Sequence, residues 1–197
     1  MVVPFFNRNA AGKLLAERLT SFATRPDVVV LALPRGGVPV GYEIARELAV
    51  SFDVCIVRKL GVPQQPELAF GAIASDDIMV LNPGVMDAWN LSSEEIELVI
   101  AQERQELARR EQAYCQGRRR VSLADRKIIL VDDGIATGAT IKAAISVIRQ
   151  YTPKEINVVI PIVSRAVFDE LKAEVERCVC LAAPETFRSI GEWYVNF

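Results

Sequence analysis

Two adjacent carboxylates followed by a run of small residues form the part of this sequence best suited to chemistry. In "IILVDDGIATGAT" (128–140), Asp132 and Asp133 end an apolar run, and glycine, alanine and threonine residues follow them. Gly134 and Gly138 would let a ligand approach the backbone, and the free amide groups at a helix start suit a phosphate. Acids beside a phosphate make sense if the same ligand also offers hydroxyl donors, as a ribose does. The stretch therefore predicts a ribose-5-phosphate site, with the acids on the sugar and the loop on the phosphate.

The composition limits which other chemistry is available. The 197 residues contain no histidine, which excludes imidazole bases, Ser-His-Asp triads and most zinc sites. The net charge of −2 gives no reason to expect binding to nucleic acid or to an anionic membrane, and the apolar runs are too short to span a bilayer. The four cysteines form no CxxC pair, which favours free thiols in a reducing cytoplasm. We expect a cytoplasmic protein whose chemistry runs on carboxylates, Arg, Lys, hydroxyls, backbone amides or a hard cation.

Apolar runs and helical patterns alternate along the chain. The runs typical of buried strands are 27–33, 53–59, 127–131, 154–163 and 177–183. Helical spacing occurs in 11–22, 40–48, 92–116, 138–150 and 164–175. This alternation predicts an α/β sheet, largely parallel, with helices on both faces.

Two local patterns refine this expectation. Residues 67–82 read as two short strands joined at Ser75–Asp77, which predicts a hairpin. Ser92 and Glu95 have the spacing of a capping box at the start of the long helix.

A second loop of the phosphate-binding kind follows the first strand. "LALPRGGVPVG" (31–41) also leaves a buried run and opens a helix, and its glycines do not fit the GxGxxG spacing of a dinucleotide site. Taken alone, Pro-Arg-Gly-Gly is an ordinary surface turn. Together with the loop after 127–131 it predicts one crevice at the ends of two strands, where open α/β sheets bind ligands.

The 128–140 stretch resembles the phosphoribosyl-pyrophosphate (PRPP) motif of the type I phosphoribosyltransferases: an apolar strand, two acids, and a small-residue loop with threonine. Gly134 departs from the pattern, in which an apolar residue or Ser is commoner. The alternatives are acids that merely end a strand before a helix capped by Thr137, and a receiver domain of a response regulator. A receiver domain usually carries its acids near its start, and too little chain follows them here.

The ends of the chain extend the resemblance. "FFNRNAAGKLLAERL" (5–19) and "SIGEWYVNF" (189–197) are similar to a poorly characterised subgroup of predicted phosphoribosyltransferases, although Asn7 stands where that subgroup would have Asp. The resemblance implies one domain, 1–197, with 83–120 as a helical insertion and the termini as a hood. It also implies a three-layer α/β/α fold whose sheet of about six strands has the order 3-2-1-4-5-6, with strand 3 antiparallel.

The resemblance further implies Mg²⁺-dependent transfer of ribose 5-phosphate from PRPP to a nucleobase-like acceptor, with release of pyrophosphate. Asp132 and Asp133 would hold the ribose and favour the positive charge that builds on it, while Arg35 and Lys59 would stabilise the departing pyrophosphate. Mg²⁺ would be held mainly by PRPP, with the two acids nearby. The general base stays open between Asp133 and the acceptor itself. The alternative is a non-catalytic PRPP or nucleotide sensor on the same fold.

The residues expected to bind PRPP are Arg35, Gly36, Gly37, Arg58, Lys59, Asp132, Asp133, Gly134, Ile135, Ala136, Thr137, Gly138, Ala139 and Thr140. Phe187 and Trp193 are candidates for stacking on the acceptor, or equally for holding the C-terminal segment to the core.

The lid is assigned to "LGVPQQPE" (60–67), predicted to be mobile, with Arg58 and Lys59 clamping pyrophosphate from its root. The basic run 118–120 is interpreted as a solvated helix end rather than an RNA contact. A homodimer is left open.

Overall fold

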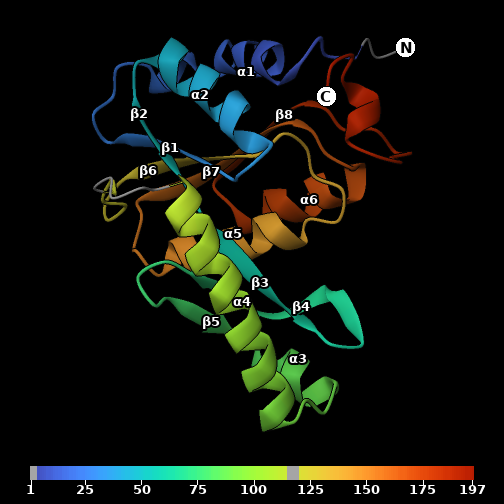
Figure 1. The fold of residues 1–197 in the computed structure, drawn as a ribbon. Coiled ribbons are helices and arrows are strands. Elements are labelled where there is room, and N and C mark those ends of the chain that lie inside the picture. Colours follow the sequence, from blue (N-terminus) through green and yellow to red (C-terminus); the bar gives the residue numbers. More distant parts are fainter. Residues whose placement is uncertain (1–3, 115–119) are drawn as a thin grey trace. The chain divides into compact units, whose positions relative to one another are not determined.

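The computed structural model describes residues 4–114 and 120–197. The described residues divide into two units, the first made of 4–55, 120–137 and 152–197 and the second of 56–114 and 138–151. Each unit has its own sheet (Figure 1). The single domain over 1–197 that the family resemblance implies stays a prediction.

A parallel five-stranded sheet forms the centre of the first unit, in the order β2-β1-β6-β7-β8. Its three middle strands are buried along almost their whole length, as expected for strands covered on both faces. The strands are β1 (Val28–Ala32), β2 (Ser51–Val54), β6 (Lys127–Val131), β7 (Glu155–Ile162) and β8 (Arg177–Ala182).

Helices cover both faces of this sheet. α1 (Arg8–Ala16) and α2 (Gly37–Leu48) lie over one face, and α6 (Arg165–Glu174) lies against the other (Figure 1). Two 3₁₀ turns, Thr20–Phe22 and Gly191–Trp193, complete the unit. The predicted three-layer α/β/α architecture with a mostly parallel sheet is confirmed.

Asn7 starts α1 as its N-cap, because its side chain accepts a hydrogen bond from the backbone amide of Ala10 at 2.8 Å. The aspartate expected there would cap the helix equally well, so this position has a structural role that either residue can fill.

The second unit contains an antiparallel sheet in the order β3-β4-β5, formed by Val57–Val62, Gln65–Ala74 and Met79–Leu81. Its helices are α3 (Pro83–Ala88), α4 (Ser93–Tyr114) and α5 (Ala139–Arg149). The predicted hairpin within 67–82 is confirmed by the β4–β5 pair. So is the capping box, since the Ser92 amide donates to Glu95 at 2.9 Å and the Glu95 amide to Ser92 Oγ at 3.2 Å.

One expectation about the strands is corrected. Residues 53–59 were expected to form a single strand, but β2 ends at Val54 and β3 begins at Val57 in a different sheet. The amide of Cys55 makes the last bond to β1, and Val57 then pairs with Ala74. The order predicted for the parallel strands is confirmed, but their sheet has five strands and contains no antiparallel strand. The antiparallel strand expected in it belongs instead to a separate sheet, where it pairs with its neighbours in sequence through hairpins.

None of the helices in the described ranges is both long and apolar enough to cross a membrane.

Candidate functional site

The two predicted loops leave neighbouring strands at the same sheet edge. β1 and β6 pair in parallel, with Ala32 opposite Val131, and the Leu33 amide donates to the Val131 carbonyl at 2.9 Å. The residues that follow each strand therefore begin side by side, within the first unit. The order of the strands reverses between β1 and β6, and open α/β sheets bind ligands at such a point.

Gly36 and Gly37 lie in contact with the two acids. A Cβ atom added to Gly36 would stand 2.1 Å from Oδ2 of Asp133, and one added to Gly37 would stand 2.7 Å from the Val131 carbonyl oxygen and 2.9 Å from Cα of Asp132. A larger residue would displace the Asp133 carboxylate at Gly36 and the backbone of Val131 and Asp132 at Gly37, so this packing requires glycine at both positions. The contact brings together the two segments that the sequence predicted to form one site.

Arg35 is exposed beside these glycines, and the Pro34–Arg35 peptide bond is cis. Gly37 opens α2 directly after it. The predicted role of Arg35 with pyrophosphate stays a prediction.

Asp133 is held on three sides. Its buried carboxylate accepts a hydrogen bond from Nε of Arg8 at 2.7 Å, its carbonyl accepts one from the Tyr194 hydroxyl at 2.6 Å, and its amide donates to Oδ1 of Asp132 at 2.8 Å. The sequence analysis missed Arg8 and Tyr194. The available signal was their presence in the two terminal segments that carried the family resemblance.

Asp132 has no such cationic partner at hydrogen-bond distance among the described residues. Burial raises the pKa of its carboxyl well above the usual range, and the neighbouring Asp133 charge raises it further. Burial, with a smaller effect of Asp133, also raises the pKa of Tyr194. A ligand that donates hydroxyl protons or brings a cation would satisfy the Asp132 carboxylate.

The packing around Gly134 explains why a glycine stands where the family pattern has a larger residue. A Cβ atom there would stand 2.6 Å from Ile190 and 2.9 Å from Ile162. The C-terminal segment thus occupies the space that a larger residue would need. The next residue, Ile135, is buried and its amide is engaged by the Ile162 carbonyl at 2.9 Å, so it anchors the loop rather than offering a donor to a ligand.

Beyond Ile135 the loop becomes accessible. Ala136 and Thr137 are exposed, and Ser164 Oγ donates to the Ala136 carbonyl at 3.1 Å. The chain enters the second unit at Gly138, whose φ of 80° favours glycine.

Ala139 and Thr140 form the first turn of α5, where amide groups have no partner within the helix. Phosphate contacts by Gly138, Ala139 and Thr140 stay a prediction.

The expectation of an irregular loop at 60–67 is corrected, while closure of this segment over pyrophosphate stays a prediction. Residues 60–67 are the tip of the β3–β4 hairpin, with Leu60 opposite Gly71 and Val62 opposite Gln65, and the side chains of Leu60 and Val62 are fully buried. The two prolines and the glycine suggested a loop, but Pro63 and Gln64 form only the turn.

Arg58 and Lys59 lie at the start of β3 and each contacts a carboxylate of the same unit. Nε of Arg58 is 2.5 Å from Oε2 of Glu103, and Nζ of Lys59 is 2.9 Å from Oε1 of Glu67. Of the alternative basic run, Arg118 and Arg119 lie outside the described residues.

Phe187 and Trp193 pack partly buried against a cluster of Phe5, Ala11, Ile162 and Tyr194. They therefore hold the C-terminal segment to the first unit. Trp193 also borders a shallow cavity of about 370 Å³, whose other lining residues are Pro4, Thr186, Arg188 and Glu192. An acceptor role for the two aromatic residues stays a prediction.

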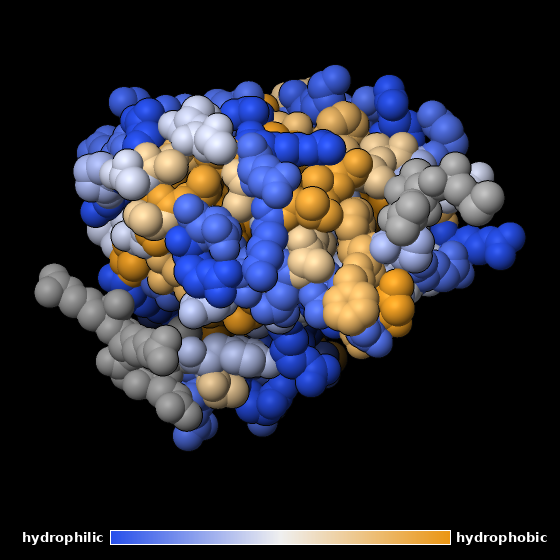
Figure 2. Space-filling view, turned by 90° about the horizontal axis from the view of Figure 1, so that it is seen from above, coloured by the Kyte–Doolittle hydropathy of each residue, from blue (hydrophilic) through white to orange (hydrophobic). Residues whose placement is uncertain are grey.

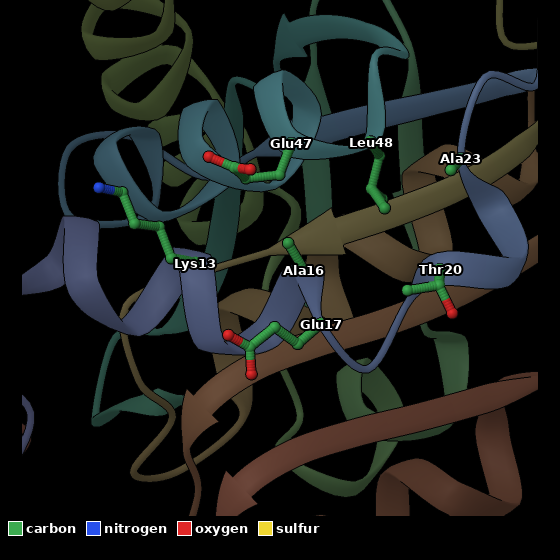
Figure 3. A pocket seen from close by; sticks show the side chains of 7 residues that line it. All are labelled: Lys13, Ala16, Glu17, Thr20, Ala23, Glu47 and Leu48. Carbon is green, nitrogen blue, oxygen red and sulfur yellow. The ribbon is translucent and has the colours of Figure 1, made fainter.

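Another cavity, of about 390 Å³, lies between α1 and the C-terminal end of α2. Figure 3 shows its lining, which contains none of the predicted site residues: Lys13, Ala16, Glu17, Thr20, Ala23, Glu47 and Leu48. The acids contact the opposite end of α2, and that helix has 12 residues, or a length of about 18 Å. This cavity is therefore separate from the candidate site.

The described residues supply only some of the oxygen ligands that a bound Mg²⁺ ion would need. They contain no group of three or more His, Cys, Asp or Glu side chains arranged to hold one. Mg²⁺ commonly binds one or two carboxylates together with substrate phosphates and water. Asp132 and Asp133 fit this mode, in which the ligand supplies most of the oxygen atoms.

Known proteins match this chain over nearly its whole length. The family model described as the phosphoribosyl transferase domain matches residues 7–190. Two curated relatives from Mycobacterium tuberculosis, each named "Putative phosphoribosyl transferase", are 44% identical over 193 residues, which is 98% of this chain. The chain spans 43% of the length of these relatives.

Solved structures agree on the fold. The crystal structure of TT1426 from Thermus thermophilus has a TM-score of 0.89 and 38% identity, over 99% of this chain and 92% of that one. The AQ2163 protein from Aquifex aeolicus, at 10% identity, has a TM-score of 0.53 over 93% of this chain and 78% of that one.

Proposed function

Because the chain belongs to the phosphoribosyl transferase domain family, we propose that it transfers ribose 5-phosphate from PRPP to a small, nucleobase-like acceptor. The bond between C1 of the ribose and the pyrophosphate oxygen breaks, and its electron pair leaves with pyrophosphate. A nucleophilic atom of the acceptor bonds to C1 and gives up its proton. The observation that carries the proposal is the contact of Gly36 and Gly37 with Asp132 and Asp133.

The two acids suit the sugar half of this reaction. Their oxygen atoms can accept hydrogen bonds from the 2′ and 3′ hydroxyls of the ribose, and their negative charge favours the positive charge that builds as the C1 bond breaks. The raised pKa of Asp132 supports this role, since strongly perturbed carboxyls concentrate at functional sites.

The glycine loop suits the pyrophosphate half. Gly37 is buried and its amide donates to the Leu33 carbonyl at 3.0 Å, so it shapes the loop. Gly36 carries no side chain and Arg35 is exposed beside it, so these two residues can meet phosphate oxygens. Charge-assisted hydrogen bonds of about 1.5–3 kcal/mol each would contribute more than the helix dipole, at about 0.3–1 kcal/mol. When bound, Mg²⁺ would neutralise pyrophosphate charge, with Asp132 and Asp133 close to it.

Ligand binding gives the first test. PRPP with Mg²⁺, present at a hundred times its dissociation constant, should stabilise the fold by about 2.7 kcal/mol. Absence of any thermal shift with millimolar PRPP and Mg²⁺ would reject the proposal. An acceptor screen that reads pyrophosphate release would then identify the second substrate.

A non-catalytic PRPP sensor is the second candidate. The observation in its favour is that the Asp133 carboxylate is already neutralised by Arg8. A sensor would bind PRPP without releasing pyrophosphate with any acceptor in the screen.

A further inference from the structure

The C-terminal segment 190–197, which we call the C-terminal latch, meets the Asp133 loop at two places and covers Arg8 at a third. Ile190 packs over Gly134, the Tyr194 hydroxyl binds the Asp133 carbonyl, and the Phe197 ring lies against Arg8. The Arg8 guanidinium carbon is 3.7 Å from the centroid of that ring. Arg8 in turn binds the Asp133 carboxylate. Both the backbone and the side chain of Asp133 therefore depend on the latch.

The latch is itself fixed to the residues that precede α1. The Phe5 amide donates to Trp193 at 2.8 Å, the Val195 amide to Phe5 at 2.9 Å and the Asn196 amide to Phe6 at 3.0 Å, all onto carbonyl oxygens. The described residues before α1 and the C-terminal segment accordingly lie side by side (Figure 1). Because Arg8 comes two residues after this paired stretch, the same hydrogen bonds help to place both Arg8 and the ring that covers it.

The surface around the latch is partly hydrophobic. Figure 2 shows hydrophobic surface on the side where Figure 1 places both ends of the chain. Phe6, Val195 and Phe197 are the most exposed large hydrophobic side chains of these segments. Phe197 is 59% exposed, so burial of the ring is not what it contributes. Its contact with the Arg8 guanidinium gives it a specific partner.

An arginine side chain has many rotamers, and holding it in one requires contacts on more than its charged end. Here Nε meets Asp133, while the guanidinium carbon lies over the Phe197 ring and 5.8 Å from the centroid of the Tyr194 ring. Arg8 also removes part of the repulsion between two adjacent acids. The result is one oriented carboxylate beside a second that still lacks a cation.

We propose that Arg8, Tyr194 and Phe197 are positioning residues that orient Asp133 toward the ribose hydroxyls of the ligand. This inference rests on the proposed function and assigns to the latch the sugar half of the site. The pyrophosphate half, at Arg35 and Gly36, meets the sugar half only through the Asp133 carboxylate beside Gly36 and should depend on the latch much less.

Calorimetric titration with three probes tests the assignment: PRPP, ribose 5-phosphate and pyrophosphate, each with Mg²⁺. Arg8→Ala should weaken the affinity for ribose 5-phosphate and PRPP by about tenfold and change the affinity for pyrophosphate much less. Tyr194→Phe and Phe197→Ala should act in the same direction with smaller losses. Arg25→Ala is the matched control, because Arg25 pairs with Asp27 on the surface of the same unit, 2.7 Å away.

Arg8→Lys should restore part of the ribose 5-phosphate affinity, since it keeps the charge but not the planar contact with the ring. Equal losses for pyrophosphate and ribose 5-phosphate would overturn the inference, because they would show a general structural defect. Unchanged affinity for ribose 5-phosphate in Arg8→Ala would overturn it as well. If the wild-type protein and these variants bind PRPP equally well, the positioning role of the latch is rejected and the proposed function stands. If the wild-type protein binds none of the three probes, the proposed function is rejected as well.

Discussion

Charge is arranged differently in the strand-end loops of the first unit and in the β3–β4 hairpin of the second. In the loops, Asp132 is pressed against Asp133, and the only charged group bound to the pair among the described residues is Arg8. In the hairpin, Arg58 and Lys59 each lie against a carboxylate of their own unit. The cations of the hairpin are balanced by carboxylates within the second unit, whereas the loops place two carboxylates side by side next to glycines.

The difference separates a site that needs a ligand from an element that is stable without one. Groups whose charge is unfavourable in the folded state are retained where function needs them. Exposed ion pairs, in contrast, contribute about 0–1 kcal/mol and mark no site by themselves. Substitutions in the loops should therefore change ligand binding strongly and those in the hairpin weakly.

The largest effect is expected from changing both acids. Asp132→Asn with Asp133→Asn should lower PRPP turnover by about a thousandfold, because the variant loses the negative charge that stabilises the developing cation. The measurement is steady-state pyrophosphate release with the acceptor found in the screen. Turnover at the wild-type level would show that the acids only end a strand, and the loops would then resemble the hairpin.

The next effect is expected at Gly36. Gly36→Ala places a Cβ atom 2.1 Å from the Asp133 carboxylate, so the acid and the loop must move apart, and a displacement of about 1 Å can cost about a hundredfold. PRPP turnover, measured by pyrophosphate release, should fall by that factor. Gly84→Ala is the control, because its nearest neighbour would be 3.4 Å away. Similar losses in both variants would show that the loss at Gly36 is not specific to the site.

The strand-end loops could be predicted from the sequence because their signals are local. An apolar run followed by acids or by Pro-Arg-Gly-Gly specifies where a strand stops, and parallel strands bring such stops to one edge. Arg8 and Tyr194 could not be found in this way. They reach Asp133 across 125 and 61 residues of chain, and no local pattern encodes such a contact.

The hairpin was predicted incorrectly for a related reason. "LGVPQQPE" (60–67) has the composition of a loop. The apolar pattern of 53–59 also runs on without showing that β2 ends and β3 begins within it. Pairing with β4 fixes Leu60 and Val62 in the core despite the nearby prolines. Tertiary pairing thus overrides composition where a turn needs only two residues.

Lys59 gives a smaller effect and tests the contrast from the hairpin side. If Lys59 clamps pyrophosphate as the sequence predicts, Lys59→Ala should lower kcat/KM by about tenfold, or about 1.4 kcal/mol of transition-state stabilisation. Glu67→Gln removes its carboxylate partner and should leave turnover equal or higher. If both variants behave like the wild type in steady-state kinetics, Lys59 belongs to a structural ion pair, and the contrast between the regions becomes sharper.

The smallest expected effect is on the stability of the ligand-free protein. Asp132→Asn should raise the free energy of unfolding at neutral pH by about 1 kcal/mol, a size common for stabilising replacements, and Tm by about 2–4 °C. Asn keeps the oxygen that accepts the Asp133 amide but carries no charge to be buried beside Asp133.

The pH dependence of this gain follows from the raised pKa of Asp132. Because the folded state holds its proton to higher pH than the unfolded state, the wild-type protein loses stability as pH rises from about 3.8, the ordinary value, through the raised pKa. The advantage of Asp132→Asn should therefore be absent below about pH 4 and grow toward neutral pH in thermal melts. Asp133→Asn is the matched control and should not stabilise, because it deprives Arg8 of its charged partner. A gain for Asp132→Asn that is independent of pH would mean that its charge carries no cost, and the strand-end loops would then be as well balanced as the hairpin.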